Sequence, residues 1–358
     1  MTEKKRTVYL DVLRIIACLC VIYNHSYEYG FSMYGERALG SAQYFVELFC
    51  SMSCKLAVPV FFALSGALLL GRKVSLRRIW LEKIPHIAFL LLAFNTLYYF
   101  REVSAGRADW GLKVYLFGLY EKSWGYHLWY LYAYIAFLIA LPTLSALAQA
   151  LDDRTLVYLL VAAIVVRCGI PGVEAFRWEN THRLNPNFDL SFLTSDIVLY
   201  PLMGYYLHAR ASRRTLRRAF PVLCVLSVLL TAVSCSMAYR DYFKTWSTYS
   251  QAYHNLFAPF LCATTFCGAR LLFERIDADS RAGRILTEIG ISTFGIYLIH
   301  LMYMEDLSGL FGLFEWIRQG TGVLPLLGSL LYCLTMMALS LIPVLILRRI
   351  PVLRRLVT

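Results

Sequence analysis

Long apolar stretches follow one another along the whole of this 358-residue chain. We count ten stretches of about 17–25 predominantly apolar residues, the length that crosses a ~30 Å hydrocarbon core as a helix. Apolar residues make up 59% of the sequence and charged residues only 16%, whereas soluble domains carry about 45–50% and roughly 25%. The sequence therefore predicts an all-α, polytopic membrane protein.

The expected spans leave no room for a soluble domain or a long linker. We therefore expect one membrane domain over residues 1–358, and the first stretch, which lacks a small-residue cleavage site, stays as a helix. The expected spans cover approximately residues 8–28, 43–70, 85–100, 127–145, 155–170, 192–207, 219–239, 254–273, 288–304 and 324–347.

The basic residues fix the expected orientation. With ten spans and a cytoplasmic N-terminus, the inner segments carry about twice as many Lys and Arg residues as the outer ones, as the positive-inside rule requires. Both termini are then cytoplasmic. The net charge of +12 is explained by these short basic runs beside anionic lipid, so we expect membrane lipid and no nucleic acid as a partner.

The ten cysteines give no sign of a metal or redox site. Most lie within apolar stretches, and no CxxC pair occurs, which predicts free thiols packed as small apolar side chains. The histidines lack the spacing of metal ligands. We therefore expect no bound metal.

The first apolar stretch contains four ionisable residues, Asp11, Arg14, His25 and Glu28. An ionisable side chain inside a membrane is costly unless it is paired or lines a wet cavity, so it indicates a functional site. Asp11 and Arg14 are three residues apart and can pair on a helix. Arg14 and His25 are eleven apart, so they share a helical face about 16 Å apart along the axis. The alternatives are an interfacial anchor for Arg14 and a packing role for His25.

Further polar residues fall at the ends of other spans. Near the outer side are His127 and Trp129, His300, Glu47 and Asp196. Near the inner side, Ser65-Gly66 permits close approach of another backbone, and the following loop adds Arg77, Arg78 and Lys83. Together with Arg14, these cations suit a phosphate-rich ligand, although basic residues at inner loops also serve as ordinary anchors.

Five segments in order resemble acyltransferase family 3, the integral-membrane O-acyltransferases. LDVLRIIACLCVIYNH matches the family's Arg-x10-His pattern through Arg14 and His25. PVFFALSG with RRIWLEKIP is similar to its "FFxxSG…RxxP" region, although Glu82 interrupts the basic series. The others are HLWYLYAYIAFLIALP, LYPLMGYYL and STFGIYLIH. The resemblance covers roughly residues 8–347.

The resemblance implies transfer of an acyl group, usually acetyl, from acyl-CoA to a hydroxyl of a surface glycan, a lipid-linked saccharide or a similar acceptor. Acetyl-CoA is then a cosubstrate, no cofactor is bound permanently, and the protein lies in the inner (plasma) membrane. Attack of a hydroxyl on a thioester needs a base and a donor to the developing oxyanion. The sequence alone leaves open the acceptor, the acyl length, an acyl-enzyme and the oligomeric state.

We expect catalysis, donor binding and acceptor binding to use residues at different depths in the membrane. His25 takes the proton, oriented by Glu28 or by a tyrosine, and His300 or His127 orients the acceptor or stabilises the oxyanion. The expected residues are His25, Glu28 and His300 for catalysis; Arg14, Asp11, Ser65, Arg77, Arg78 and Lys83 for the acyl-CoA donor; and His127, Trp129, Glu47 and Asp196 for the acceptor.

A second function class fits many of the same features. Intramembrane charges in a bundle of ten helices also suit a transporter of a small solute such as an amino acid. Against transport, we find no inverted repeat and no pair of broken helices in matching halves. A scaffold without chemistry leaves the Arg14 and His25 alignment unexplained, so we favour the enzyme.

Overall fold

The computed structural model describes residues 6–178, 181–242, 256–306 and 314–354, which form helices and connecting loops with no strand. Contacts divide the chain into two compact units, a larger one of residues 1–68 and 153–358 and a smaller one of residues 69–152. An all-α fold was expected.

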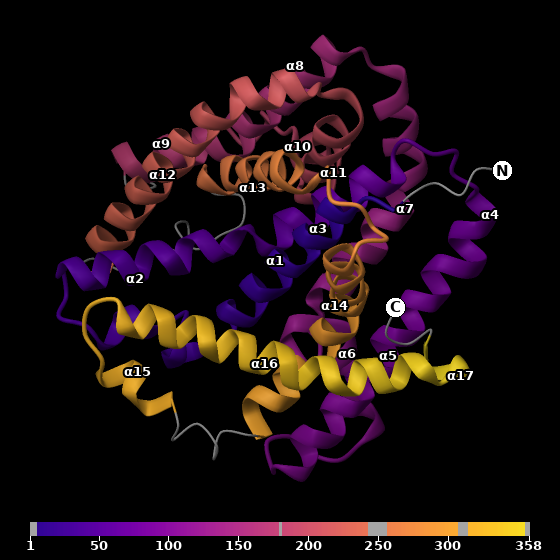
Figure 1. The fold of residues 1–358 in the computed structure, drawn as a ribbon, viewed down its shortest axis with the longest axis vertical. Coiled ribbons are helices and arrows are strands. Elements are labelled where there is room, and N and C mark those ends of the chain that lie inside the picture. Colours follow the sequence, from indigo (N-terminus) through magenta and orange to yellow (C-terminus); the bar gives the residue numbers. More distant parts are fainter. Residues whose placement is uncertain (1–5, 179–180, 243–255, 307–313, 355–358) are drawn as a thin grey trace. The chain divides into compact units, whose positions relative to one another are not determined.

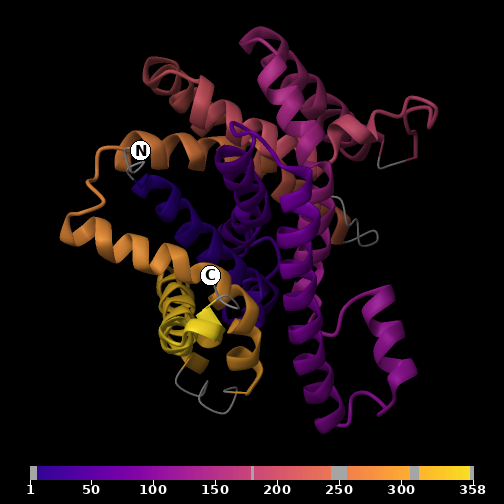
Figure 2. The ribbon, with the colours of Figure 1, turned by 90° about the vertical axis from the view of Figure 1, so that its right-hand side faces the viewer.

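The larger unit is built around its first helix, α1 (Val8–Asn24), which packs against α13, α14 and α16 (Figures 1 and 2). Polar groups gather at both ends of α1. The other helices of this unit are α2 (Ala42–Ser53), α3 (Ala57–Leu69), α8 (Asp153–Ile164), α9 (Ile170–Trp178), α10 (Ser191–Thr194), α11 (Asp196–Tyr205), α12 (Arg213–Tyr242), α13 (Phe257–Phe273), α14 (Arg281–Asp306), α15 (Glu315–Gln319), α16 (Leu324–Arg349) and α17 (Pro351–Arg354).

Helix α1 ends at Asn24, and so the expected helix over residues 8–28 is too long. The hydroxyl of Ser26 donates to the carbonyl of Tyr23 and accepts from the amide of Phe31, so it competes with the helical hydrogen bonds. Tyr27 then takes φ +45°, in the left-handed region. Glu28 therefore lies in a short 3₁₀ turn, Tyr27–Tyr29, beyond the helix.

Two glycines bring the backbones of α3 and α11 together. A Cβ at Gly66 would lie 1.9 Å from the carbonyl oxygen of Pro201, and one at Gly204 would lie 1.9 Å from that of Ala63. Such contact is possible only where neither residue has a side chain. The close approach expected at Ser65-Gly66 is confirmed, and its partner is the segment LYPLMGYYL.

Within the described residues, three π-helical turns interrupt the regular helices. They are Ile79–Lys83 before α5, Val165–Gly169 between α8 and α9, and Tyr206–Arg210 after α11. A π turn widens the helix by one residue and recurs at functional sites. The last of these turns carries His208, which lines a pocket at the start of α1.

The smaller unit contains α4 (Leu76–Arg78), α5 (Ile84–Ser104), α6 (Leu112–Glu121) and α7 (Trp129–Ala150). Helices α5 and α7 pack together, and α6 is joined to them by two loops (Figure 2). Ser145 and Gln149 on α7 donate to the carbonyl of Leu70 at 3.0 and 2.8 Å. These bonds attach the first loop of this unit to α7.

Six helical segments of the described chain are long and apolar enough to cross a membrane, and α13 is a shorter apolar helix. They coincide with the second, fourth, fifth, seventh, ninth and tenth expected spans. The count of ten and the cytoplasmic termini stay predictions. The six segments are Ala42–Leu69, Tyr126–Ala150, Asp153–Arg177, Arg213–Arg240, Arg281–Met304 and Leu324–Arg349.

Candidate functional site

The first turns of α1 hold a buried carboxylate that binds two arginines. Asp11 is 1% exposed and accepts two hydrogen bonds from Arg6, each at 2.8 Å, and one from Arg14. The hydroxyl of Thr287 on α14 lies 3.4 Å away. The expected pairing of Asp11 with Arg14 is confirmed. Asp11 therefore fixes the two guanidinium groups.

Helix α14 reaches Asp11 because it has a glycine at the contact. A Cβ at Gly290 would lie 2.5 Å from the Cβ of Asp11, so any larger residue would push α14 away from α1. The ion cluster is thus placed by the packing of two helices.

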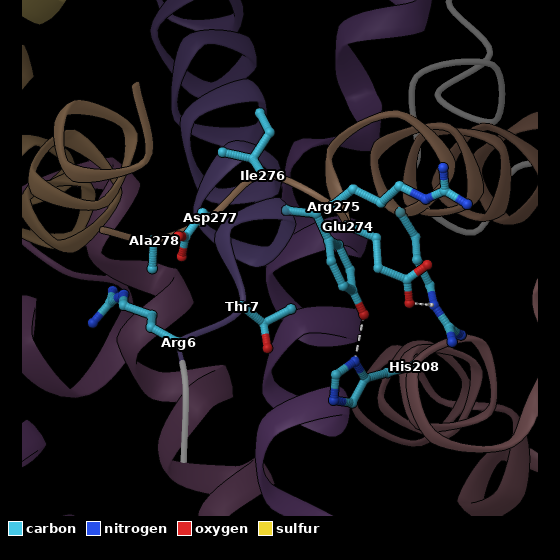
Figure 3. Close-up of a pocket in the computed structure, with 10 residues that line it drawn as sticks. Arg6, Thr7, His208, Glu274, Arg275, Ile276, Asp277 and Ala278 are labelled. Atoms are coloured by element: carbon cyan, nitrogen blue, oxygen red, sulfur yellow. Dashed lines mark hydrogen bonds and ion pairs between the residues drawn. The ribbon is translucent and has the colours of Figure 1, made fainter. Parts of the chain in front are cut away.

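A pocket of about 540 Å³ opens beside this cluster, around the start of α1 (Figure 3). Arg6 lies on one side of it, and Arg275, Glu274 and His208 lie on the other. Its lining residues come from α1 and the residues before it, from the π turn after α11, and from the end of α13 and the segment that follows. They are Arg6, Thr7, Tyr9, His208, Arg270, Glu274, Arg275, Ile276, Asp277 and Ala278.

The wall formed by α13 is held by Arg270. This guanidinium donates to the carbonyls of Leu207 and Ala211 at 2.5 and 3.0 Å and to Glu274 at 3.1 Å. Arg213 also donates to Glu274, at 2.7 Å. Although partial burial acts to raise it, the hydrogen bonds and charges of Arg270 and Arg213 hold the pKa of Glu274 below its ordinary value. Glu274 therefore stays charged between them.

The C-terminal end of α1 carries a pair of histidines from two helices. Nδ1 of His25, the residue that ends α1, lies 2.8 Å from Nε2 of His300 on α14. The ring planes are 16° apart and the centroids 5.1 Å apart, so the two rings meet edge to edge and are nearly coplanar. His300 is fully buried, and its Nδ1 lies 2.8 Å from the carbonyl oxygen of Tyr297.

This geometry assigns the protons of the pair when both rings are neutral. A carbonyl oxygen only accepts, so Nδ1 of His300 carries the proton that it shares with Tyr297. Nε2 of His300 then accepts from the protonated Nδ1 of His25. The lone pair of His25 is therefore on Nε2, the arrangement that a general base requires.

Glu28 was expected to orient His25, and Glu47 was expected to orient the acceptor. Glu28 makes no hydrogen bond or ion pair within the described part of the chain, so it is His300 that contacts Nδ1 of His25. Glu47 is fully buried and pairs with Arg37 at 2.9 Å. Arg37 also donates to the carbonyls of Ile317 and Gly320, both at 3.0 Å. Arg37 had no distinguishing signal in the sequence.

Asp196 begins α11 near Arg167 of the second π turn. Its Oδ1 lies 4.0 Å from Nε of Arg167, a separation too long for a direct hydrogen bond. Ser65 is used locally, because its hydroxyl donates to the carbonyl of Phe61 at 2.9 Å.

The remaining expected residues belong to the smaller unit. The buried ring of His127 packs edge-on against Tyr98 at 5.1 Å, and Trp129 is the first residue of α7. Arg78 forms an exposed ion pair with Glu82 at 3.2 Å, so the carboxylate that interrupts the basic series offsets one of its charges. Arg77 lies in the same short helix, and Lys83 ends the following π turn.

Comparison with known proteins identifies the family of the chain. A family model described as an acyltransferase domain matches residues 7–345, nearly the whole chain. No curated protein and no solved structure gives a significant match. Helices that can cross a membrane and an acyltransferase domain together make the protein a membrane acyltransferase. The chain belongs to acyltransferase family 3.

Proposed function

We propose that the protein transfers an acyl group, normally acetyl, from acyl-CoA on the cytoplasmic side to a hydroxyl of a cell-surface or lipid-linked saccharide. The observation that carries the proposal is the hydrogen bond between His25 and His300, because it leaves a lone pair on Nε2 of His25. The family match supports the reaction class. The donor, the acceptor and the roles of single residues are proposed here.

The reaction begins with the acceptor hydroxyl. Nε2 of His25 takes the hydroxyl proton while the oxygen attacks the thioester carbonyl and forms a tetrahedral intermediate. The C–S bond then breaks, the ester remains on the acceptor, and the CoA thiolate takes the proton from His25. The base is regenerated, and no redox partner is needed.

His300 acts through His25 as a positioning residue. Its ring lies edge to edge with the ring of His25 and is itself oriented by the carbonyl of Tyr297. When His25 gains a proton on Nε2, its Nδ1–H still donates to His300, so the charged form keeps the same orientation. This arrangement corresponds to the orienting member of a catalytic triad, with a histidine in place of a carboxylate.

The donor approaches from the other end of α1. Arg14 lies about 16 Å from His25 along the helix, and Asp11 fixes its guanidinium. A slender pantetheine arm that extends from Arg14 towards His25 brings the thioester to an acceptor that never enters the cytoplasm. Asp196, Glu47, Trp129 and His127 stay candidates for orienting that acceptor.

The proposal is tested with purified protein in lipid nanodiscs. Release of free thiol from acetyl-CoA is followed with and without saccharides extracted from the cell envelope, and the saccharides are then weighed by mass spectrometry. We expect thiol release that depends on the saccharide, with an acetyl group added per thiol. Solute uptake into proteoliposomes without thioester consumption would overturn the proposal in favour of transport.

A further inference from the structure

Lys55 places a positive charge near the middle of the apolar segment Ala42–Leu69, one of the segments that can cross a membrane. The only other charged residue of that segment is Glu47, which pairs with Arg37. A lysine at such a position is costly in a membrane and marks a functional site. We propose that Lys55 is a catalytic residue, which stabilises the oxyanion that forms when the acceptor attacks the thioester; this inference rests on the proposed function.

The regular α-helix is interrupted at Lys55. Residues Cys54–Leu56 form a 3₁₀ turn between α2 and α3, and a 3₁₀ stretch inside a long helical segment often marks a functional position. Irregular backbone at membrane depth is tolerated only where it is buried in protein or lines a wet cavity. The turn packs against α1 and α13. The backbone of Lys55 therefore lies among the helices that surround α1.

The backbone of Lys55 is attached to the end of α1. The side-chain amide of Asn24, the last residue of α1, donates to the carbonyl of Cys54 at 2.9 Å. Asn24 comes directly before His25, and Cys54 comes directly before Lys55. One hydrogen bond therefore joins the residue before the proposed base to the residue before the lysine, and it holds the two chain segments together.

The ammonium of Lys55 is held near the other sequence neighbour of His25. Its Nζ lies 4.2 Å from the centroid of the Phe31 ring, a cation–π contact that strengthens where water is excluded. The amide of Phe31 donates to the hydroxyl of Ser26, the residue after His25, at 3.1 Å. The carbonyl of Phe31 accepts from Ser51 at 2.7 Å. Phe31 is thus fixed at both of its backbone groups, and it places the ammonium beside the end of α1.

The histidine pair leaves the task of binding an oxyanion to another group. Nδ1 of His25 donates to His300, and Nδ1 of His300 donates to the carbonyl of Tyr297, so both N–H groups of the neutral pair are in use. Lys55 has three N–H donors and a full positive charge. Lys55 and His25 are both half-buried, so each keeps a surface that a substrate can reach.

Lys55 keeps its proton throughout the reaction. When the acceptor oxygen attacks, the π electrons of the thioester C=O bond move onto the carbonyl oxygen, which accepts a hydrogen bond from the ammonium. Nε2 of His25 takes the hydroxyl proton. When the C–S bond breaks, the electron pair on oxygen re-forms the C=O bond, and the sulfur leaves as a thiolate that takes the proton from His25. Because the oxygen is fully charged only in the intermediate, Lys55 stabilises that state more than the bound thioester, which raises kcat.

The test measures thiol release from acetyl-CoA in nanodiscs by the wild type, Lys55→Met and Lys55→Arg. Loss of one oxyanion donor costs about 10²–10³ in kcat, so Lys55→Met should lower kcat and kcat/KM together by about 100-fold. Lys55→Arg keeps the charge and should recover at least about tenfold of that loss. Lys113→Met is the matched control and should equal the wild type, because Lys113 also lies over an aromatic ring, that of Phe117 at 5.7 Å, but is exposed on α6.

A second donor separates stabilisation of charge from a structural role of Lys55. The fluorine of fluoroacetyl-CoA withdraws electrons and itself stabilises the oxyanion, so the reaction depends less on the ammonium. The fall in kcat caused by Lys55→Met should therefore be severalfold smaller with fluoroacetyl-CoA than with acetyl-CoA. Both donors are measured on one sample, so the ratio does not depend on the fraction of the variant that is folded. An equal fall with the two donors would overturn the inference.

The outcomes separate this inference from the proposed function. If the wild type releases no thiol from acetyl-CoA, the proposed function is wrong. If the wild type is active and Lys55→Met keeps its kcat, or Lys55→Arg loses as much as Lys55→Met at an equal melting midpoint, another group stabilises the oxyanion and the enzyme assignment stands. A rise confined to the KM for an acidic saccharide would also overturn the inference, in favour of a lysine that binds the acceptor.

Discussion

Substitution of His300 tests how the histidine pair works. The amide of glutamine extends about as far from the backbone as Nε2 of histidine, and that of asparagine about as far as Nδ1. His300→Gln therefore keeps an acceptor for Nδ1–H of His25, whereas His300→Asn keeps only the donor to the carbonyl of Tyr297. The two variants therefore separate the two hydrogen bonds of His300, and because asparagine is one methylene smaller than glutamine, their stabilities are compared as well.

The expected size of the effect follows from the single 2.8 Å bond between His25 and His300. Leaving a buried donor without an acceptor costs about 1–3 kcal/mol, and each 1.36 kcal/mol is tenfold in rate. His300→Asn should therefore lower kcat roughly 5- to 150-fold. His300→Gln should stay within about fivefold of the wild type, because the bond is kept.

The assay is thiol release under saturating acetyl-CoA, with kcat and KM determined separately and the melting midpoint of each variant measured as a control. KM for the donor should stay unchanged, because His300 touches His25 and not the donor's nucleotide. The reasoning is refuted if Asn and Gln at this position give equal kcat at equal stability. It is also refuted if either variant changes KM alone.

Further predictions concern packing and buried charge. Gly66→Ala places a Cβ 1.9 Å from the carbonyl oxygen of Pro201, so we expect a large loss in the yield of monodisperse protein in detergent. Gly35→Ala is the control, because a Cβ there meets no atom within 4 Å, and its yield should equal that of the wild type. Glu47→Gln removes the partner of Arg37, whose side chain is 8% exposed, and should destabilise the protein by about 3–5 kcal/mol, seen as a lower thermal midpoint. The double variant with Arg37→Met should recover part of that loss, and a midpoint below that of Glu47→Gln alone would contradict the pairing.

Contacts within one helix were the most predictable from the sequence. Asp11 and Arg14 pair because residues three apart share a helical face. The role of Ser65-Gly66 followed from residue size, since only glycine permits the contact with Pro201. These inferences need helical geometry and no knowledge of the partner helix. All ten cysteines are also free thiols.

Contacts between helices were less predictable because they depend on packing. The sequence placed His25 and His300 at comparable depth, but it could not show that His300, rather than Glu28, meets Nδ1 of His25. The cause is local, since Ser26 and the positive φ of Tyr27 end α1 before Glu28. Helical periodicity alone carries no information about such a stop.

The pocket at the start of α1 could not be predicted for a similar reason. His208 lies in a π turn and Arg275 follows α13, and neither residue stands out from the other basic residues between the apolar stretches. Arg6 follows two lysines at the start of the chain and resembles any other member of a short basic run. What joins them is the packing of three segments around the start of α1.

The most direct test is the acceptor-dependent rate of thiol release by His25→Ala in nanodiscs, compared with the rate of the wild type. The comparison requires that the two proteins have the same melting midpoint. The account predicts a fall of about 10²–10⁴-fold in kcat, the usual contribution of a general base, with acetyl-CoA still bound. A variant that turns over within a factor of two of the wild type would remove the His25 and His300 pair from the chemistry.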